Sequence, residues 1–421
     1  MSAGFETVLF AVGLLAGVTV IVRVGAVGVF AGLALAVSIP GARSVAFLQV
    51  LAPLALVAEL ARIDRSRGRQ VGQTSGPLGF ATVAFVVWIT LSVLWTIDFG
   101  ATIKALTLLA SGAAGLYSLQ LYGRRRGMYS IWGAWFILGL VQATTALAWW
   151  GAGRPARFDL QSVSSPLLIV SQDLRLGHPF LGLSSYYASF CILFVVPAVC
   201  RIGPQAIRLA SGAANAIALA LTVSRGGILA TITGVAIALL LTVRSPRRAF
   251  GWILAGSATA VAAVHYVFSR RSFSGSSFLA DPARATLRSI SFGIIHQHVL
   301  KGSGYGSWVA FPSIPQGTHN YLLTIWLETG IVGLILFLCC NVLFFARMWR
   351  CSDRQMRGAA IGLFVAVWFD IVVEASLEGV YFELQILLLI GILLGMPKRR
   401  PRLLNLSAPF ALRTLVREVP R

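Results

Sequence analysis

Long apolar runs, separated by short polar or basic segments, extend over most of the chain. Apolar runs of about 17 to 25 residues are long enough to cross a bilayer as helices. The second run is short, so a hairpin or a re-entrant segment over 4–39 is an alternative there. The pattern predicts an all-α integral membrane protein, a single polytopic domain over 1–421 with about 12–13 transmembrane helices. The runs lie near 4–22, 24–39, 45–61, 78–97, 101–122, 129–149, 183–200, 205–223, 226–243, 249–268, 319–346, 358–375 and 381–396.

Basic residues concentrate in alternate loops from residue 62 onward. Because Lys and Arg mark cytoplasmic loops, this alternation predicts that these loops and the C-terminal tail are cytoplasmic. Together with attraction to anionic lipid headgroups, this topology explains much of the net charge of +21, and nucleic-acid binding is not needed. The basic tail, 397–421, alternates charged with apolar residues and suits lying along the inner leaflet. The basic loops contain Arg62 to Arg69, Arg124 to Arg126, Arg201 and Arg208, Arg244 to Arg248, and Arg347 to Arg357.

The opposite face carries an unexpected excess of cations. It comprises a first outer loop at 150–182, a large outer loop at 269–318 and the short turn at 223–227, and the same side of the membrane also carries all five histidines. Cations on this face predict an anionic substrate. The outer loops lack a carboxylate or cysteine cluster, and His296 and His298 face different directions on a helix, so we expect no metal and no cofactor. The basic residues here are Arg154, Arg157, Arg175, Arg225, Arg270, Arg271, Arg284, Arg288 and Lys301, against Asp159, Asp173 and Asp281.

A short amphipathic helix is predicted in the large loop. Asp281 and Pro282 form a good helix start, and the run continues to Leu300. Arg284 and Arg288 are one turn apart, so both guanidinium groups project from one side, where two forks can straddle a diphosphate. The alternative is an ordinary solvated helix face. The glycines that follow, Gly302 and Gly304, either let backbone N–H groups approach a phosphate or form a flexible loop.

His319 is the candidate general base. If Thr318 caps the long helix after it, His319 lies in the first turn, where the helix dipole keeps the imidazole neutral and able to accept a proton. The alternative is a hydrogen-bonded histidine at the membrane boundary. Glu328, nine residues on, lies on the opposite side of that helix and is interpreted as a buried partner of a neighbouring span.

Two further positions are candidates for anion binding. Arg225 lies in the tight turn Ser224-Arg225-Gly226-Gly227, where an arginine is costly unless it meets an anion, either a substrate or a lipid phosphate. In the first outer loop, Arg175 and His178 precede the apolar and aromatic stretch 180–187, which either re-enters the membrane or lines a lipid groove.

Three stretches resemble the O-antigen ligase and polymerase superfamily. They are Ser224-Arg225-Gly226-Gly227, the run from Arg284 through Gly302-Ser303-Gly304, and His319-Asn320-Tyr321-Leu322 followed by Glu328-Thr329-Gly330. The similarity spans roughly 205–340, with a weaker echo at 175–177, and the third stretch is the most specific. Two positions depart from the pattern, because Arg288 stands where relatives often have tryptophan and Phe180 replaces an expected asparagine.

The resemblance implies a GT-C-like fold in the bacterial inner membrane, with catalysis at the periplasmic face and without metal or nucleotide. It implies that His319 activates an acceptor hydroxyl while Arg225 and Arg284 hold the diphosphate of an undecaprenyl-diphosphate-linked glycan. Arg288 and Arg175 are further diphosphate candidates. Asn320, Gly302, Gly304 and His178 are the supporting residues.

Two activities within this family and one outside it remain open at this point. A ligase passes the glycan to lipid A–core, and a polymerase passes it to another lipid-linked repeat unit; we favour the ligase. A transporter of an anionic or lipid-linked solute is the third hypothesis. It would predict inverted halves and charges near the bilayer midplane, which the sequence does not display.

Overall fold

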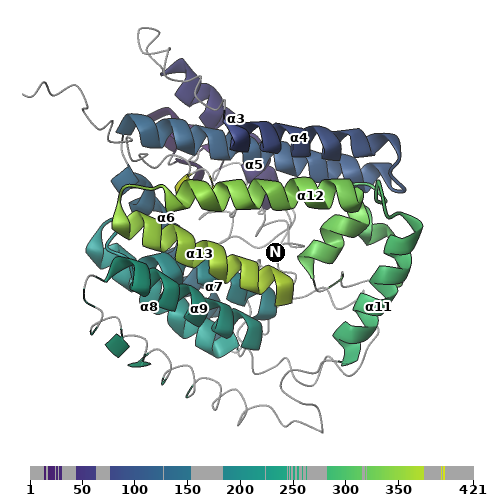
Figure 1. The fold of residues 1–421 in the computed structure, drawn as a ribbon. Helices are drawn as coiled ribbons and strands as arrows, with labels where there is room; N and C mark the ends of the chain where they lie inside the picture. The colour runs from purple at the N-terminus through teal and green to yellow at the C-terminus, as the bar shows by residue number, and fades with distance from the viewer. Residues whose placement is uncertain are drawn as a thin grey trace, which may run out of the picture.

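The described part of the chain is helical and contains no β-strand. A computed structural model describes residues 44–62, 76–126, 128–152, 184–222, 224–243, 282–314, 318 and 320–373, together with short pieces of 14–30, 245–262 and 390–393. Figure 1 shows the helices as a bundle with α11 at one end. The elements are α3 (Ser44–Ala61), α4 (Pro77–Leu91), η2 (Ser92–Leu94), α5 (Phe99–Arg126), α6 (Met128–Gly151), α7 (Ser184–Ala198), α8 (Gln205–Thr222), α9 (Arg225–Thr242), α11 (Pro282–Gln297), η5 (Ser307–Ala310), α12 (Tyr321–Trp349) and α13 (Arg354–Val373).

The all-α, multi-pass prediction is confirmed. Within the described residues, six helices are long and apolar enough to cross a membrane: α4 with η2, α5, α6, α9, α12 and α13. Each predicted run from 45–61 to 226–243, and those at 319–346 and 358–375, coincides with a helix. The runs at 4–22, 24–39, 249–268 and 381–396 lie wholly or largely outside the described residues, so the total number of spans stays a prediction.

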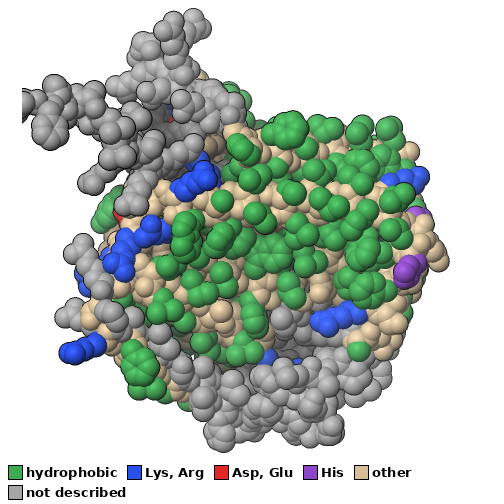
Figure 2. All heavy atoms as spheres, viewed as in Figure 1, with side chains coloured by type: hydrophobic (Ala, Val, Ile, Leu, Met, Phe, Trp, Pro, Cys, Tyr) green, Lys and Arg blue, Asp and Glu red, His purple; other side chains and the backbone are tan. Residues whose placement is uncertain are grey.

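The surface divides into an apolar middle and two polar ends. In Figure 2, apolar side chains cover most of the visible face, and Lys and Arg side chains gather toward the end at the left. The opposite end, where Figure 1 places α11, carries histidine together with basic side chains. This distribution fits the predicted topology, in which a basic cytoplasmic end and a cationic outer end flank the bilayer.

Small residues bring α9 and α13 into backbone contact. A Cβ added at Gly234 would lie 2.6 Å from the Cβ of Ala366, and one at Gly362 would lie 2.5 Å from the carbonyl oxygen of Gly234. Such small residues allow close packing where apolar burial alone does not drive helices together. The pairs Gly358 with Thr242 and Gly234 with Ala366 show that the helices are antiparallel. The start of α9 therefore lies beside the end of α13.

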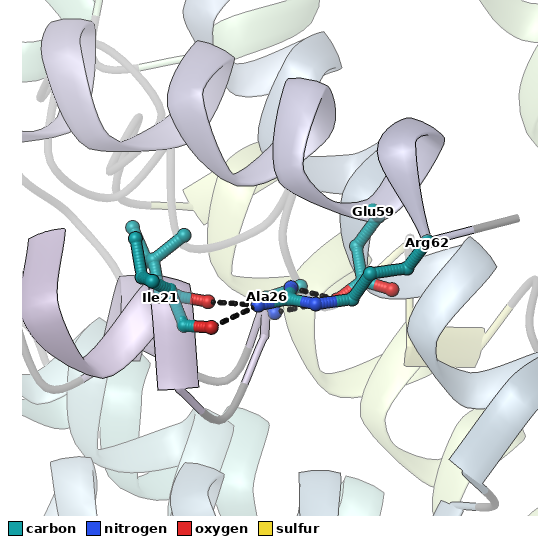
Figure 3. A network of polar contacts seen from close by, with 5 residues as sticks. Ile21, Ala26, Glu59 and Arg62 are labelled. Carbon is teal, nitrogen blue, oxygen red and sulfur yellow. Dashed lines mark hydrogen bonds and ion pairs between the residues drawn. The ribbon is translucent and has the colours of Figure 1, made fainter.

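A buried carboxylate joins α3 to the N-terminal region (Figure 3). Glu59 accepts a hydrogen bond from the backbone N–H of Ala26 at 3.0 Å and forms an ion pair with Arg62 at 3.4 Å. Arg62 also donates to the carbonyl oxygens of Ile21, at 2.9 Å, and of Val22. These carbonyls belong to the last residues of the helical piece 18–23, so Arg62 caps its C-terminus.

The long helix α12 is divided at Gly330. The backbone angles of Gly330, φ 68° and ψ −177°, lie outside the helical range. The rings of Tyr321 and Phe337 have centroids 5.8 Å apart, although sixteen residues of straight helix span about 24 Å. Residues 321–329, hereafter the half-helix, must therefore fold back along the longer segment 331–349. The predicted cap is also wrong, because Asn320 and not Thr318 is the N-cap.

Candidate active site

The glycine loop, residues 302–306, supplies hydrogen bonds that α12 loses at its kink. The N–H groups of Ser303 and Gly304 donate to the carbonyl oxygens of Leu327 and Glu328, at 2.9 and 2.8 Å. Carbonyls at the end of a helix need such partners, and more so at membrane depth. The loop thus offsets the cost of breaking the helical hydrogen bonds of α12 at its kink.

Two more bonds complete this arrangement. The indole Nε1 of Trp88, in α4, donates to the carbonyl oxygen of Thr329 at 2.8 Å. The N–H of Ile331 donates to the carbonyl oxygen of Val299 at 2.8 Å, between the end of α11 and the loop. Elements from three parts of the chain therefore fix the direction of the half-helix.

Glycine is required where the two backbones meet. Gly302 and Gly330 both have positive φ, at 72° and 68°. A Cβ on Gly302 would lie 2.3 Å from the carbonyl of Glu328, and a Cβ on Gly330 would lie 2.1 Å from the carbonyl oxygen of Leu300. Neither position has space for a side chain, and neither backbone conformation suits one.

The amide groups of the glycine loop are used within the protein. Gly302 donates to the carbonyl oxygen of His298 at 2.9 Å, and Gly304 donates to Glu328. Both glycines are buried, so the loop is neither an open phosphate cradle nor a flexible connection. Both glycines lie at hydrogen bonds or close contacts with the backbone of the half-helix.

The start of the half-helix lies inside the bundle. Asn320 accepts hydrogen bonds through Oδ1 from the N–H groups of Leu322 at 3.0 Å and Leu323 at 3.3 Å. The contact of Tyr321 with Phe337 places this start about 10 Å along the longer segment, two helical turns from the kink. His319 itself lies outside the described residues. Its neighbour Asn320 is therefore held well within the fold, away from the outermost turn of a straight span.

The apolar side of α11 packs against the half-helix. Ile295 of α11 and Ile314 form a buried cluster with Leu323 and Leu327, and Leu287, Ile290 and Ile294 pack on it. The predicted amphipathic helix is confirmed, although it ends at Gln297 and turns cover the residues up to Lys301. Arg288 is exposed on α11. The backbone of Arg284 lies one turn earlier, and its side chain is outside the described part.

Arg225 is the first residue of α9. The hydroxyl of Ser224 caps this helix by accepting a hydrogen bond from the N–H of Gly227 at 3.3 Å. A Cβ on Gly227 would lie 2.6 Å from the Cβ of Ala188 in α7, so the glycine allows the turn to pack against that helix. Arg225 is half-buried and belongs to the α9 and α13 pair, on a different element from Arg284 and Arg288. Arg175 and His178 lie outside the described residues.

Besides Glu59, two more carboxylates are buried in the described part. Glu328 is 3% exposed and its Oε1 accepts a hydrogen bond from the N–H of Trp308, at 3.4 Å. This hydrogen bond joins Glu328 to η5. The burial of Glu328 agrees with the prediction, and a partner in a neighbouring span stays a prediction. Asp370 is fully buried near the end of α13, on the side where α9 begins. Sequence reasoning missed Asp370, although an acidic residue in the apolar run 358–375 is itself a signal.

Comparison with known proteins agrees with the resemblance noted in the sequence. No curated protein matches the chain. Residues 210–338 match the family described as O-antigen ligase, and this range contains α9, α11, the glycine loop and the half-helix. The match supports a glycosyltransferase-like enzyme of the ligase or polymerase type. The chain is therefore a multi-pass membrane protein that carries an O-antigen ligase domain over residues 210–338.

Proposed function

We propose that the protein is an O-antigen ligase-like glycosyltransferase. It transfers a glycan from undecaprenyl diphosphate to lipid A–core at the periplasmic face of the bacterial inner membrane, with inversion and without a metal. The observation that carries the proposal is the packing of α11 on the half-helix within the matched domain. This packing brings the helix that bears Arg284 and Arg288 to the element that starts two residues after His319.

The proposed reaction is a single displacement. His319 takes the proton from an acceptor hydroxyl, whose oxygen attacks the anomeric carbon of the lipid-linked glycan. The bond from that carbon to the diphosphate oxygen breaks, and the electron pair leaves with the diphosphate. Arg225 and Arg284, with Arg288, stabilise the developing negative charge through bidentate hydrogen bonds. Arg175 is a further diphosphate-binding residue and His178 a supporting residue, both from the first outer loop.

Purified protein with a lipid-linked donor and a lipid A–core acceptor tests the base assignment. Removing a general base reduces the rate by roughly 10²- to 10⁴-fold, so His319→Ala should lose transfer on this scale. His296→Ala is the matched control, because His296 is an exposed histidine in the last turn of α11. Normal transfer by His319→Ala would refute the role of His319.

The acceptor distinguishes ligase from polymerase. A strain without the gene should lose long-chain lipopolysaccharide and still accumulate lipid-linked polymer if the protein is a ligase. Loss of the polymer itself would instead assign the polymerase reaction. Product formation in detergent, without a gradient or a second compartment, separates both from a transporter.

A further inference from the structure

The hydroxyl of Thr318 ties together the backbone around position 319. Thr318 is fully buried. Its Oγ1 accepts a hydrogen bond from the N–H of Asn320 at 3.1 Å and donates to the carbonyl oxygen of the same residue at 2.6 Å. The Oγ1 of Thr318 also lies 2.8 Å from the Oγ1 of Thr324, which belongs to the first turn of the half-helix.

The donors and acceptors form one consistent set. A hydroxyl has one proton and accepts two hydrogen bonds. If the proton of Thr318 goes to the carbonyl of Asn320, its two lone pairs receive the N–H of Asn320 and the hydroxyl of Thr324. These three bonds join Thr318, the residue before His319, to Asn320 and to Thr324.

The N–H of Asn320 belongs to the peptide unit that joins it to His319. A bond to this N–H restrains the backbone directly after the proposed base, and the cap formed by Asn320 holds the half-helix start. We propose that Thr318, together with Thr324, is a positioning residue that sets the place of the His319 imidazole relative to the acceptor hydroxyl. This inference rests on the proposed function of His319.

Thr318→Val and Thr318→Ser separate the hydroxyl from the shape of the side chain. Valine keeps the volume and removes all three hydrogen bonds, whereas serine keeps the hydroxyl. Thr329→Val is the matched control, because Thr329 is also fully buried in the half-helix and its hydroxyl donates only to the carbonyl of Ile325, one turn back, at 2.6 Å. Undecaprenyl diphosphate serves as the binding probe for each purified variant.

A misplaced catalytic group costs up to about a hundredfold in rate. We therefore expect Thr318→Val to lower the single-turnover rate by about ten- to a hundredfold, while the stoichiometry and the Kd of probe binding stay at the wild-type values. Thr318→Ser should restore most of the rate, and Thr329→Val should stay within about twofold of the wild type. Thr324→Val should show a smaller loss than Thr318→Val, because it removes one of the three bonds.

Two results would overturn the inference. One is a Thr318→Val rate close to that of Thr329→Val; the other is a loss of rate matched by an equal loss of binding stoichiometry, which would mean misfolding. His319→Ala, measured beside these variants, keeps the two proposals apart. If His319→Ala is active, the assignment of His319 as the base is refuted. If His319→Ala is inactive and Thr318→Val has the wild-type rate, only the positioning role of Thr318 is refuted.

Discussion

At the scale of single residues, three charged side chains of the described part bond to backbone groups. Glu59 accepts from Ala26, Arg62 caps two carbonyls and Glu328 accepts from Trp308. A buried charge without partners is costly in a membrane protein. Each of these residues therefore stabilises a place where the helical hydrogen bonding stops.

Substitution of Glu59 tests this view. Glu59→Gln keeps an oxygen for the N–H of Ala26 and loses the charge that faces Arg62, whereas Glu59→Ala loses both. An unsatisfied buried donor costs about 1–3 kcal/mol. We expect thermal unfolding midpoints to fall in the order wild type, Glu59→Gln, Glu59→Ala. Equal midpoints for the three proteins would show that the contact does not contribute to stability.

At the scale of elements, the half-helix is the main departure from the expected architecture. An apolar run of this length predicts one straight span, and Gly330 in such a run is compatible with an unbroken helix. What bends α12 is the glycine loop, which approaches from a segment about thirty residues earlier and supplies the alternative hydrogen bonds. The direction of the half-helix is therefore a property of two segments together.

Alanine at Gly302 or Gly330 should disrupt the contact between the glycine loop and α12. Gly302→Ala and Gly330→Ala each add a Cβ where a backbone carbonyl lies, in addition to strain of about 1–3 kcal/mol for an unfavourable φ. Both variants should unfold at lower temperature and lose transfer.

Gly293→Ala in α11 is the control for this pair. A Cβ there meets nothing within 4 Å, and alanine favours a helix by about 1 kcal/mol over glycine. This variant should be as stable as the wild type or more so. Wild-type stability of Gly302→Ala and Gly330→Ala would contradict the close backbone contact.

At the scale of the whole molecule, the two polar ends should face opposite sides of the membrane. Lys301, at the end with α11, and Arg350, after α12, are both exposed. In cells with a permeabilised outer membrane, an impermeant maleimide should label Lys301→Cys directly and Arg350→Cys only after lysis. Labelling of both, or the reverse order, would invert the topology.

The native loop cysteines should give little background in that experiment. Cys200 follows α7, and Cys351 lies between α12 and α13. Both side chains are buried. Burial raises the pKa of Cys200 to about 12, with a smaller opposing effect of Arg208, and burial also raises the pKa of Cys351. Both thiols therefore stay protonated, and maleimide reacts with the thiolate.

The sequence by itself determined the membrane class, the helix positions and the resemblance to the O-antigen ligase family, because apolar run length, loop charge and short motifs are local properties. It also placed Arg225 in the turn before a predicted span and Arg288 on an amphipathic helix. Only the tertiary structure decided that α12 folds back at Gly330, that the glycine loop binds backbone and that Thr318 bonds with Thr324. The first two features depend on hydrogen bonds between segments more than twenty residues apart, and the third depends on how the chain turns into the half-helix; no local pattern specifies these partners.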